Sequence, residues 1–195
     1  MAISAWDKSE SKGEDGVTVM RKIVLFIAMS LDGYIADSNG GVGWLGGELP
    51  EENDMVSYQE FIKDIDTVIM GSNTYNQLVT ELSPNEWMYP HFTSYIVTHH
   101  PKQSTDEIRF TDESPAQLVT RLKAETGKDI WVCGGAAIVR QLVQNGLIDK
   151  YYINVMPTIL GSGIHLFDTL ENEIKLKLIQ TKSYNGITDL VYERR

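Results

Sequence analysis

The chain has 195 residues, of which 42% are hydrophobic, and this is enough for one sizeable hydrophobic core. Its formal net charge of −10 disfavours general binding to nucleic-acid phosphates or anionic lipids, because both would be repelled. The longest apolar run, 23–31, is about half as long as a membrane span.

Residues 1–19 are polar and acidic, so we expect a disordered leader followed by one folded domain at 20–195. The leader lacks the positive-then-apolar layout of a secretory signal peptide. The single cysteine, Cys133, cannot form an internal disulfide. Together these features predict a cytoplasmic protein.

From residue 21 onward, strand-like and helix-like segments alternate. Apolar and β-branched runs predict strands at 22–29, 67–70, 94–98, 130–133 and 150–156. Helical spacing and capping signals predict helices at 51–62, 73–82, 114–127 and 136–145. The third of these begins with Ser114, Pro115 and Gln117, which supply a cap, a first-turn proline and the partner of a capping box.

The last part of the chain has a different pattern. Residues 174–181 alternate apolar and charged side chains, as an antiparallel strand with one wet face does. Asn185-Gly186 predicts a tight turn, after which 187–194 returns as the partner strand of a hairpin. The sequence therefore predicts one α/β domain, with a mainly parallel sheet flanked by helices and a C-terminal antiparallel hairpin.

Two of the predicted strand-to-helix junctions contain glycine. One strand leads through Gly134-Gly135 directly into a helix, and another ends at Gly71 before polar residues open the next helix. Glycine lets a ligand approach the backbone, and a helix start offers unpaired amides to a phosphate. A tight turn without a ligand explains either junction alone. Two junctions in one α/β domain favour a shared, extended anionic ligand.

The end of the first strand leaves room for a flat ring, because small residues such as Ala28 and Ser30 stand there. A glycine-rich loop follows at 39–47, and we expect it to be mobile and able to close over a site. Trp44, within this loop, is predicted to form a wall of that site.

The order and spacing of these pieces resemble the dihydrofolate reductase superfamily, and most closely its riboflavin-biosynthesis (RibD) C-terminal reductase branch. The phrase Ser30-Leu31-Asp32-Gly33-Tyr34-Ile35-Ala36 is typical of that branch. So are Gly134-Gly135, Gly146-Leu147-Ile148-Asp149, Pro157-Thr158-Ile159-Leu160-Gly161-Ser162-Gly163 and Leu166-Phe167. The resemblance extends over residues 21–194.

The resemblance implies a nicotinamide dinucleotide site with assigned parts. The nicotinamide would lie against the backbone of Ala28 and beside Ile35. The pyrophosphate and the adenine-side ribose would lie over Gly71, Ser72, Asn73 and Thr74. The adenosine would be lined by Val97, Thr98 and His99. The second phosphate cradle would be formed by Gly134, Gly135, Ala136, Ala137 and Ile138.

The resemblance also implies a substrate pocket beside the nicotinamide. Trp44, Asp54 and Tyr58 would face the substrate ring, and Asn154 would border it. In dihydrofolate reductases, an arginine usually follows the glycine that corresponds to Gly71 and pairs with the 2′-phosphate of NADPH. This chain has Ser72 at that position. We expect NADPH as the cofactor, with NADH as the alternative unless a nearby cation compensates; the candidates are His99, His100 and Lys102.

Hydride transfer to a C=N or C=O group also requires a proton. We predict Asp54 as its donor, because a helix from about residue 51 would turn this carboxyl toward the pocket. A first-turn position that favours the helix dipole is the alternative explanation of Asp54. Which protein carboxylate faces the substrate stays open, since Glu51 and Glu52 lie close to Asp54 in the sequence. Asp32 is the other candidate acid, although its turn before Gly33 favours a structural hydrogen bond.

No metal site is expected, because the four histidines and the cysteine lack metal-ligand spacing, and Cys133 is predicted to be inert core. A zinc-deaminase motif is absent from the sequence. The resemblance implies a homodimeric reductase that transfers a hydride to a pyrimidine- or pterin-type substrate, with 5-amino-6-(5-phosphoribosylamino)uracil as the named one. The net charge and the short apolar runs predict no nucleic-acid or membrane partner. Dihydrofolate reduction is the alternative reaction. A dinucleotide-binding protein without turnover is the alternative from another class.

Overall fold

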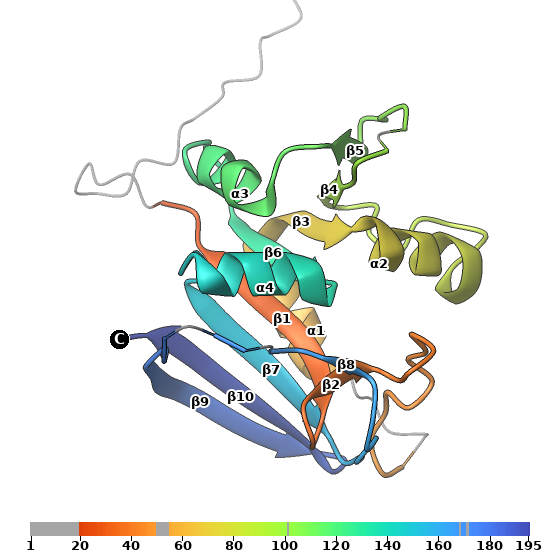
Figure 1. Cartoon of the computed structure of the whole chain (residues 1–195), viewed down its shortest axis with the longest axis vertical. Coiled ribbons are helices and arrows are strands. Elements are labelled where there is room, and N and C mark those ends of the chain that lie inside the picture. Colours follow the sequence, from red (N-terminus) through yellow and green to blue (C-terminus); the bar gives the residue numbers. More distant parts are fainter. Residues whose placement is uncertain (1–19, 50–54, 101, 168, 171) are drawn as a thin grey trace, which may run out of the picture.

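The computed structural model describes residues 20–49, 55–100, 102–167, 169–170 and 172–195. Its main feature is an eight-stranded sheet with the order β5-β4-β3-β6-β1-β7-β10-β9 (Figure 1). In that order the strands are Ile108–Thr111, Thr93–Val97, Ile65–Gly71, Asp129–Gly134, Ile23–Ser30, Lys150–Met156, Ile187–Arg194 and Leu176–Tyr184. A two-stranded sheet pairs β2 (Tyr34–Ala36) with β8 (Ile164–His165).

The strands from β5 to β7 in this order run parallel, and β10 and β9 are antiparallel to their neighbours. The carboxyl ends of β4, β3, β6, β1 and β7 therefore meet along one edge of the sheet. The β9–β10 turn has positive φ at Asn185 (45°) and Gly186 (75°), as its Asn-Gly sequence predicts. The predicted α/β class with a C-terminal antiparallel hairpin is confirmed.

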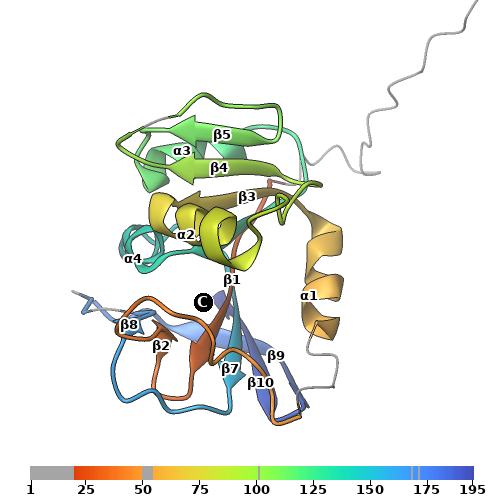
Figure 2. The ribbon, with the colours of Figure 1, turned by 90° about the vertical axis from the view of Figure 1, so that its right-hand side faces the viewer.

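Among the described residues, four α-helices flank the sheet: α1 (Val56–Phe61), α2 (Ser72–Gln77), α3 (Pro115–Lys123) and α4 (Ala136–Gln144). A 3-10 turn at 62–64 continues α1, and a π-helical turn at 78–82 continues α2. Figure 2 shows α1 on one side of the sheet and α4 on the other. No helix in the described ranges is long and apolar enough to cross a membrane.

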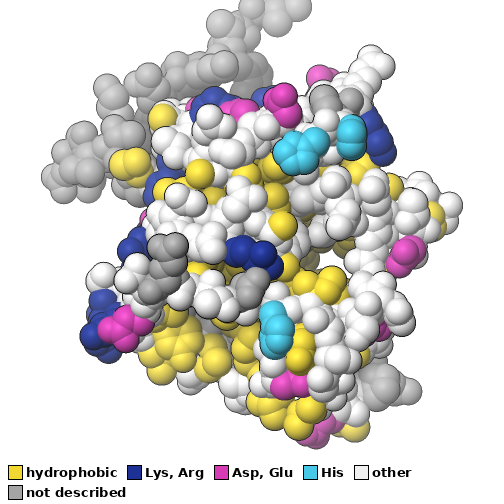
Figure 3. Space-filling model, viewed as in Figure 1, with side chains coloured by type: hydrophobic (Ala, Val, Ile, Leu, Met, Phe, Trp, Pro, Cys, Tyr) yellow, Lys and Arg dark blue, Asp and Glu magenta, His cyan; other side chains and the backbone are white. Residues whose placement is uncertain are grey.

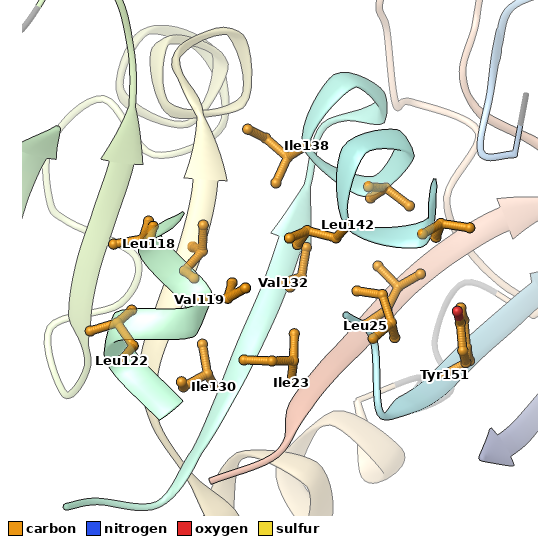
Figure 4. Packing of buried hydrophobic residues seen from close by; sticks show 14 of the residues in the cluster. Ile23, Leu25, Leu118, Val119, Leu122, Ile130, Val132, Ile138, Leu142 and Tyr151 are labelled. Carbon is orange, nitrogen blue, oxygen red and sulfur yellow. The ribbon is translucent and has the colours of Figure 1, made fainter. Parts of the chain in front are cut away.

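A hydrophobic cluster lies on each face of the sheet. The larger one packs α3 and α4 onto β1, β3, β6 and β7, with fully buried side chains such as Leu25, Leu118 and Leu142 (Figure 4). On the opposite face, aromatic rings pack against α1. The rings of Phe26 and Phe61 stack with centroids 4.3 Å apart, and Trp131 meets both edge-on.

The structure corrects several element boundaries. The helix predicted at 51–62 begins at Val56 in the described part of the chain. The helix predicted to end at Gly127 ends at Lys123. Gly127 serves another purpose: a Cβ there would lie 2.6 Å from Asp66 Oδ2 and 3.0 Å from Arg21 Cζ, so glycine lets this ion pair form. Strands β2, β5 and β8 were not predicted, because short strands depend on distant pairing partners.

Candidate active site

Three strand ends that the sequence singled out lie side by side at the carboxyl edge of the sheet. In the β3–β4 pairing, Gly71 is opposite Val97, and in the β3–β6 pairing Met70 is opposite Gly134. The segment after β4 carries Thr98 and His99. The next two strands in the sheet are β3, which leads into α2, and β6, which leads into α4. Strand order thus brings the three predicted parts of the cofactor site together.

The starts of α2 and α4 are in contact. A Cβ at Gly135 would lie 3.3 Å from the hydroxyl oxygen of Thr74, and one at Gly71 would lie 3.4 Å from Cγ1 of Ile138. Gly134 has a φ of +136°, which disfavours any other residue, and its peptide bond to Gly135 is cis. Side chains at these positions would fill the space between the two helix starts.

Neither helix start is capped by its own side chain. The N-cap residues are Gly71 for α2 and Gly135 for α4, and no side-chain cap hydrogen bond is formed at either. In contrast, α3 has a complete capping box between Ser114 and Gln117. Because the first amides of α4 lack an internal acceptor, they suit an external anion such as a phosphate. The start of α4 could therefore hold a phosphate through backbone groups, despite the net negative charge of the chain.

The surface is hollowed next to these helix starts. Figure 3 shows a recess between the part of the chain that carries α2 and the part that carries β2 and β8. On the α2 side of this region, the ammonium of Lys102 lies 5.3 Å from the ring centre of Tyr75, one helical turn after Ser72. His99 and His100 are both exposed. Lys102 thus lies against the helix that begins with Ser72.

At the other end of the site, β1 and β7 run side by side. Ala28 is paired with Asn154, which is buried, and Ala28 itself is partly exposed. Beyond β7, Pro157 and Thr158 line an open cavity of about 490 Å³ together with Trp44 and its neighbours in the glycine-rich loop. Ile35 lies in β2 and packs against the larger hydrophobic cluster. The predicted wall residue Trp44 does border a cavity at this edge.

Hydrogen bonds order the glycine-rich loop and connect it to the rest of the domain. Asp37 Oδ1 accepts hydrogen bonds from the amides of Asn39 and Gly41. Gln77 of α2 donates to the Gly40 carbonyl at 2.9 Å. The Glu48 amide donates to the carbonyl of Asn185 in the β9–β10 turn. The loop thereby connects the cofactor side of the site with the hairpin.

Tyr58 of α1 faces the aromatic cluster. Its ring lies edge-on to Phe26 and Trp131, with centroid distances of 6.0 Å and 5.8 Å. Burial raises the pKa of the Tyr58 phenol, so it stays protonated at neutral pH. The preceding residue, Ser57, is almost fully buried and fixes α1 to the sheet through a hydrogen bond to Asp189. Asp54, the predicted proton donor, lies outside the described residues, as do Glu51 and Glu52.

The sequence interpretation missed a buried carboxylate, Asp189 of β10. Its partners Ser57, Tyr152, Asn154 and Tyr184 come from α1, β7 and β9. Burial raises the pKa of Tyr184 to about 12 and also raises that of Tyr152, so both phenols keep a proton to donate. A sequence signal existed. Asp189 stands in alternation with buried Ile187 and Val191, on the face of the strand that should be apolar.

Asp32 has the structural role that its turn position favours. Its carboxylate accepts hydrogen bonds from Ser30 Oγ and from the amides of Leu160 and Gly161. The hydrogen bond from Ser30, with help from these amides, lowers the pKa of Asp32 to about 2, although desolvation opposes the shift. Asp32 is therefore ionised at neutral pH and cannot be the proton donor.

The described residues contain no group of three or more acidic, histidine or cysteine side chains that could hold a metal ion. Burial raises the pKa of the Cys133 thiol to about 11, and its sulfur lies 3.8 Å from the hydroxyl of Tyr89. A thiol with this pKa is almost entirely protonated at neutral pH and is a poor nucleophile.

Comparisons with known proteins agree with this geometry. Residues 21–192 match the family described as RibD C-terminal domain. The uncharacterized protein YwjB of Bacillus subtilis (strain 168) is 42% identical over 175 residues, which span 89% of this chain and 98% of the relative.

Three solved structures share the fold. A protein of Shewanella sp. PV-4 assigned to riboflavin biosynthesis is 25% identical, with a TM-score of 0.77, over 89% of this chain and 99% of its own. The deaminase/5-amino-6-(5-phosphoribosylamino)uracil reductase of Thermotoga maritima is 15% identical (TM-score 0.69), over 90% of this chain and 57% of its own. Dihydrofolate reductase of Enterococcus faecalis, in complex with NADP(H), is 14% identical (TM-score 0.61), over 89% of this chain and 96% of its own.

Proposed function

Because this chain belongs to the RibD C-terminal domain family, we propose that it is an NADPH-dependent reductase of a pyrimidine-type substrate. The named activity that we propose is reduction of the ribosyl group of 5-amino-6-(5-phosphoribosylamino)uracil, the substrate in the name of the Thermotoga maritima protein. The observation that carries the proposal is the contact between the two glycine junctions, where Thr74 meets Gly135 beside the uncapped start of α4.

The chain's own residues would divide the work along the carboxyl edge of the sheet. Backbone amides at the start of α4 would hold a phosphate, and the junction at Gly71 would receive the adenosine side. Ala28 would present its backbone to the nicotinamide, which supplies the hydride when the dinucleotide is bound. Trp44, which lies in the glycine-rich loop, would form one wall of the substrate pocket, and Asp54 would supply the proton.

Binding and turnover test this proposal separately. We expect NADPH to raise the melting temperature and to quench tryptophan fluorescence, and to do so more strongly than NADH. We expect loss of absorbance at 340 nm when the aminouracil ribosyl phosphate is added. If neither dinucleotide binds, the cofactor assignment is wrong. Binding without oxidation, with this substrate and with dihydrofolate, would identify a dinucleotide-binding protein without reductase activity.

The proton donor can be tested within the same assay. We expect Asp54→Asn to lower kcat about 100-fold or more while leaving NADPH affinity unchanged, since general acid catalysis contributes on this scale. The kcat of the parent should fall at high pH, where the donor loses its proton, and this alkaline limb of the pH profile should disappear in the variant. Equal activity of the variant and the parent would remove Asp54 from the site.

We also propose that the enzyme acts in the cytoplasm as a homodimer. Strand β9 ends the sheet, and Leu178 and Ile179 on this strand are 51% and 44% exposed, which suits contact with a second copy. Light scattering after size-exclusion chromatography should give twice the chain's mass of 22.0 kDa. A monomer at micromolar concentration would refute the dimer and leave the reductase proposal intact.

A further inference from the structure

Asp189 is a fully buried carboxylate in the sheet, close to the proposed substrate pocket. It is 0% exposed and lies opposite Asn154 in the β7–β10 pairing, and Asn154 lies opposite Ala28 in the β1–β7 pairing. A buried ionised carboxylate is costly unless hydrogen-bond donors surround it. The polar side chains around Asp189 must therefore point their hydrogen-bond donors toward its carboxylate.

The described residues give Asp189 four hydrogen-bond donors. Oδ2 accepts from Ser57 Oγ and, at 3.5 Å, from the Tyr152 hydroxyl. Oδ1 accepts from Nδ2 of Asn154 at 2.5 Å and from the Tyr184 hydroxyl at 3.3 Å. These donors fill the roughly four lone-pair positions of a carboxylate. Asp189 thus has no acceptor capacity left for a ligand, and its influence must pass through its partners.

Asn154 is the partner that the family resemblance assigns to the proposed substrate pocket, and it is paired with Ala28 of β1. Its amino group faces Asp189, since the carbonyl oxygen of the amide would repel a carboxylate. In the planar carboxamide, Oδ1 therefore points away from Asp189. Within the described part of the chain, no residue donates a hydrogen bond to this oxygen, although Asn154 is only 5% exposed. Oδ1 is not among the fully buried unpaired side-chain atoms of the described residues, so it reaches the surface and could accept from a ligand that carries a donor.

We propose that Asp189 is a positioning residue that fixes Asn154 with Oδ1 toward the substrate, so that the site selects heterocycles presenting an N–H or amino group at this edge. The inference deepens the proposed function, because it takes the pocket beside Ala28 as the substrate site. Aminouracils carry such donors on the ring and on the exocyclic nitrogens. A heterocycle with only acceptors at this edge would leave Asn154 Oδ1 unpaired and would bind poorly.

A double-mutant cycle tests whether Asp189 acts through Asn154. The probe is 5,6-diaminouracil, titrated calorimetrically into the full chain saturated with NADP⁺. We expect Asn154→Leu and Asp189→Val each to weaken probe binding about 10-fold, as loss of one hydrogen bond does. The double variant should also be about 10-fold weaker, not 100-fold, because Asp189 has nothing to orient once Asn154 is gone. Additive effects would overturn the inference.

Two further measurements separate positioning from general stabilisation. Tyr184→Phe removes a donor from the same carboxylate without touching Asn154, so probe affinity should stay within about threefold of the parent. Asp189→Asn keeps an oxygen toward Asn154 and should restore most of the affinity that Asp189→Val loses. If Tyr184→Phe weakens the probe as much as Asp189→Val, the role of Asp189 is structural only.

The orientation of Asn154 can also be measured on the unmodified protein, which covers the case in which Asp189→Val does not fold. Nuclear magnetic resonance should show the Asn154 side-chain amide protected from hydrogen exchange, and exchange at the rate of a free carboxamide would overturn the inference. Tryptophan quenching by NADP⁺ in the same samples separates the two proposals. Normal cofactor binding without probe binding refutes this inference, and probe binding without cofactor binding refutes the proposed cofactor function.

Discussion

Thr74 and Gly135 meet where α2 and α4 begin, with the threonine hydroxyl oxygen 3.3 Å from the position that a Cβ at residue 135 would occupy. A methyl group at this point would push against Thr74 and occupy the space that we assign to a phosphate. We expect Gly135→Ala to weaken NADPH binding about 10-fold or more, measured by tryptophan quenching. Adding Thr74→Ala should recover stability but not affinity. Full recovery of affinity would show that only the clash mattered.

The resemblance described above aligns Ser72 with the position at which dihydrofolate reductases usually carry an arginine for the 2′-phosphate. Introducing that charge by Ser72→Arg should raise the preference for NADPH over NADH about 10-fold, measured as the ratio of kcat/KM values. Lys102→Ala should lower the same ratio, because the lysine lies on Tyr75 of the helix that Ser72 begins. An unchanged ratio in both variants would place the 2′-phosphate elsewhere.

The carboxylate of Asp32 should make acid stability depend on pH in a defined window. Its pKa is about 2 in the folded chain, compared with an ordinary value of 3.8, so the unfolded chain binds the proton more readily. The stabilisation is present above about pH 4 and is lost as the pH falls toward 2. Asp32→Asn should therefore unfold at a lower temperature than the parent at pH 7, and the difference should vanish near pH 2. A constant difference would contradict this assignment.

Cys133 should be unreactive in the folded protein. With a pKa of about 11, compared with an ordinary value of 9.0, it holds about 100-fold less thiolate at pH 8 than an exposed cysteine. Labelling with Ellman's reagent should slow by at least this factor in the native state and recover in guanidinium chloride. Cys133→Ala should keep its turnover. Rapid native labelling would reveal an opening of the aromatic cluster around Tyr89.

The capping box of α3 should contribute to stability without touching the active site. Ser114 and Gln117 satisfy the first amides of this helix, so Ser114→Ala should cost about 1 kcal/mol of unfolding free energy. Urea unfolding measures this loss, and the NADPH affinity of the variant should equal that of the parent. A changed NADPH affinity in Ser114→Ala would mean that the stability of α3 is coupled to the cofactor site.

Much of the local structure could be predicted, because it depends on neighbours in the sequence. Ser114 and Gln117 cap a helix that begins where they predict, and Asn185-Gly186 forms the hairpin turn. The Gly71 and Gly134 junctions could be recognised for the same reason. Boundaries that depend on distant residues were less predictable. The helix before Gly127 ends early, and Gly127 instead admits the Arg21–Asp66 ion pair.

The alternation of strands and helices, the glycine junctions and the resemblance to a reductase family can all be recognised from short stretches of residues. Which strands are neighbours depends on the folded chain, and the fold places Gly71, Val97 and Gly134 at one edge of the sheet. The fold also brings Asp189 together with Asn154 and Ser57, which lie 35 and 132 residues away. A buried carboxylate needs hydrogen-bond donors, and these come from residues that are far away in the sequence and become neighbours only when the whole chain packs.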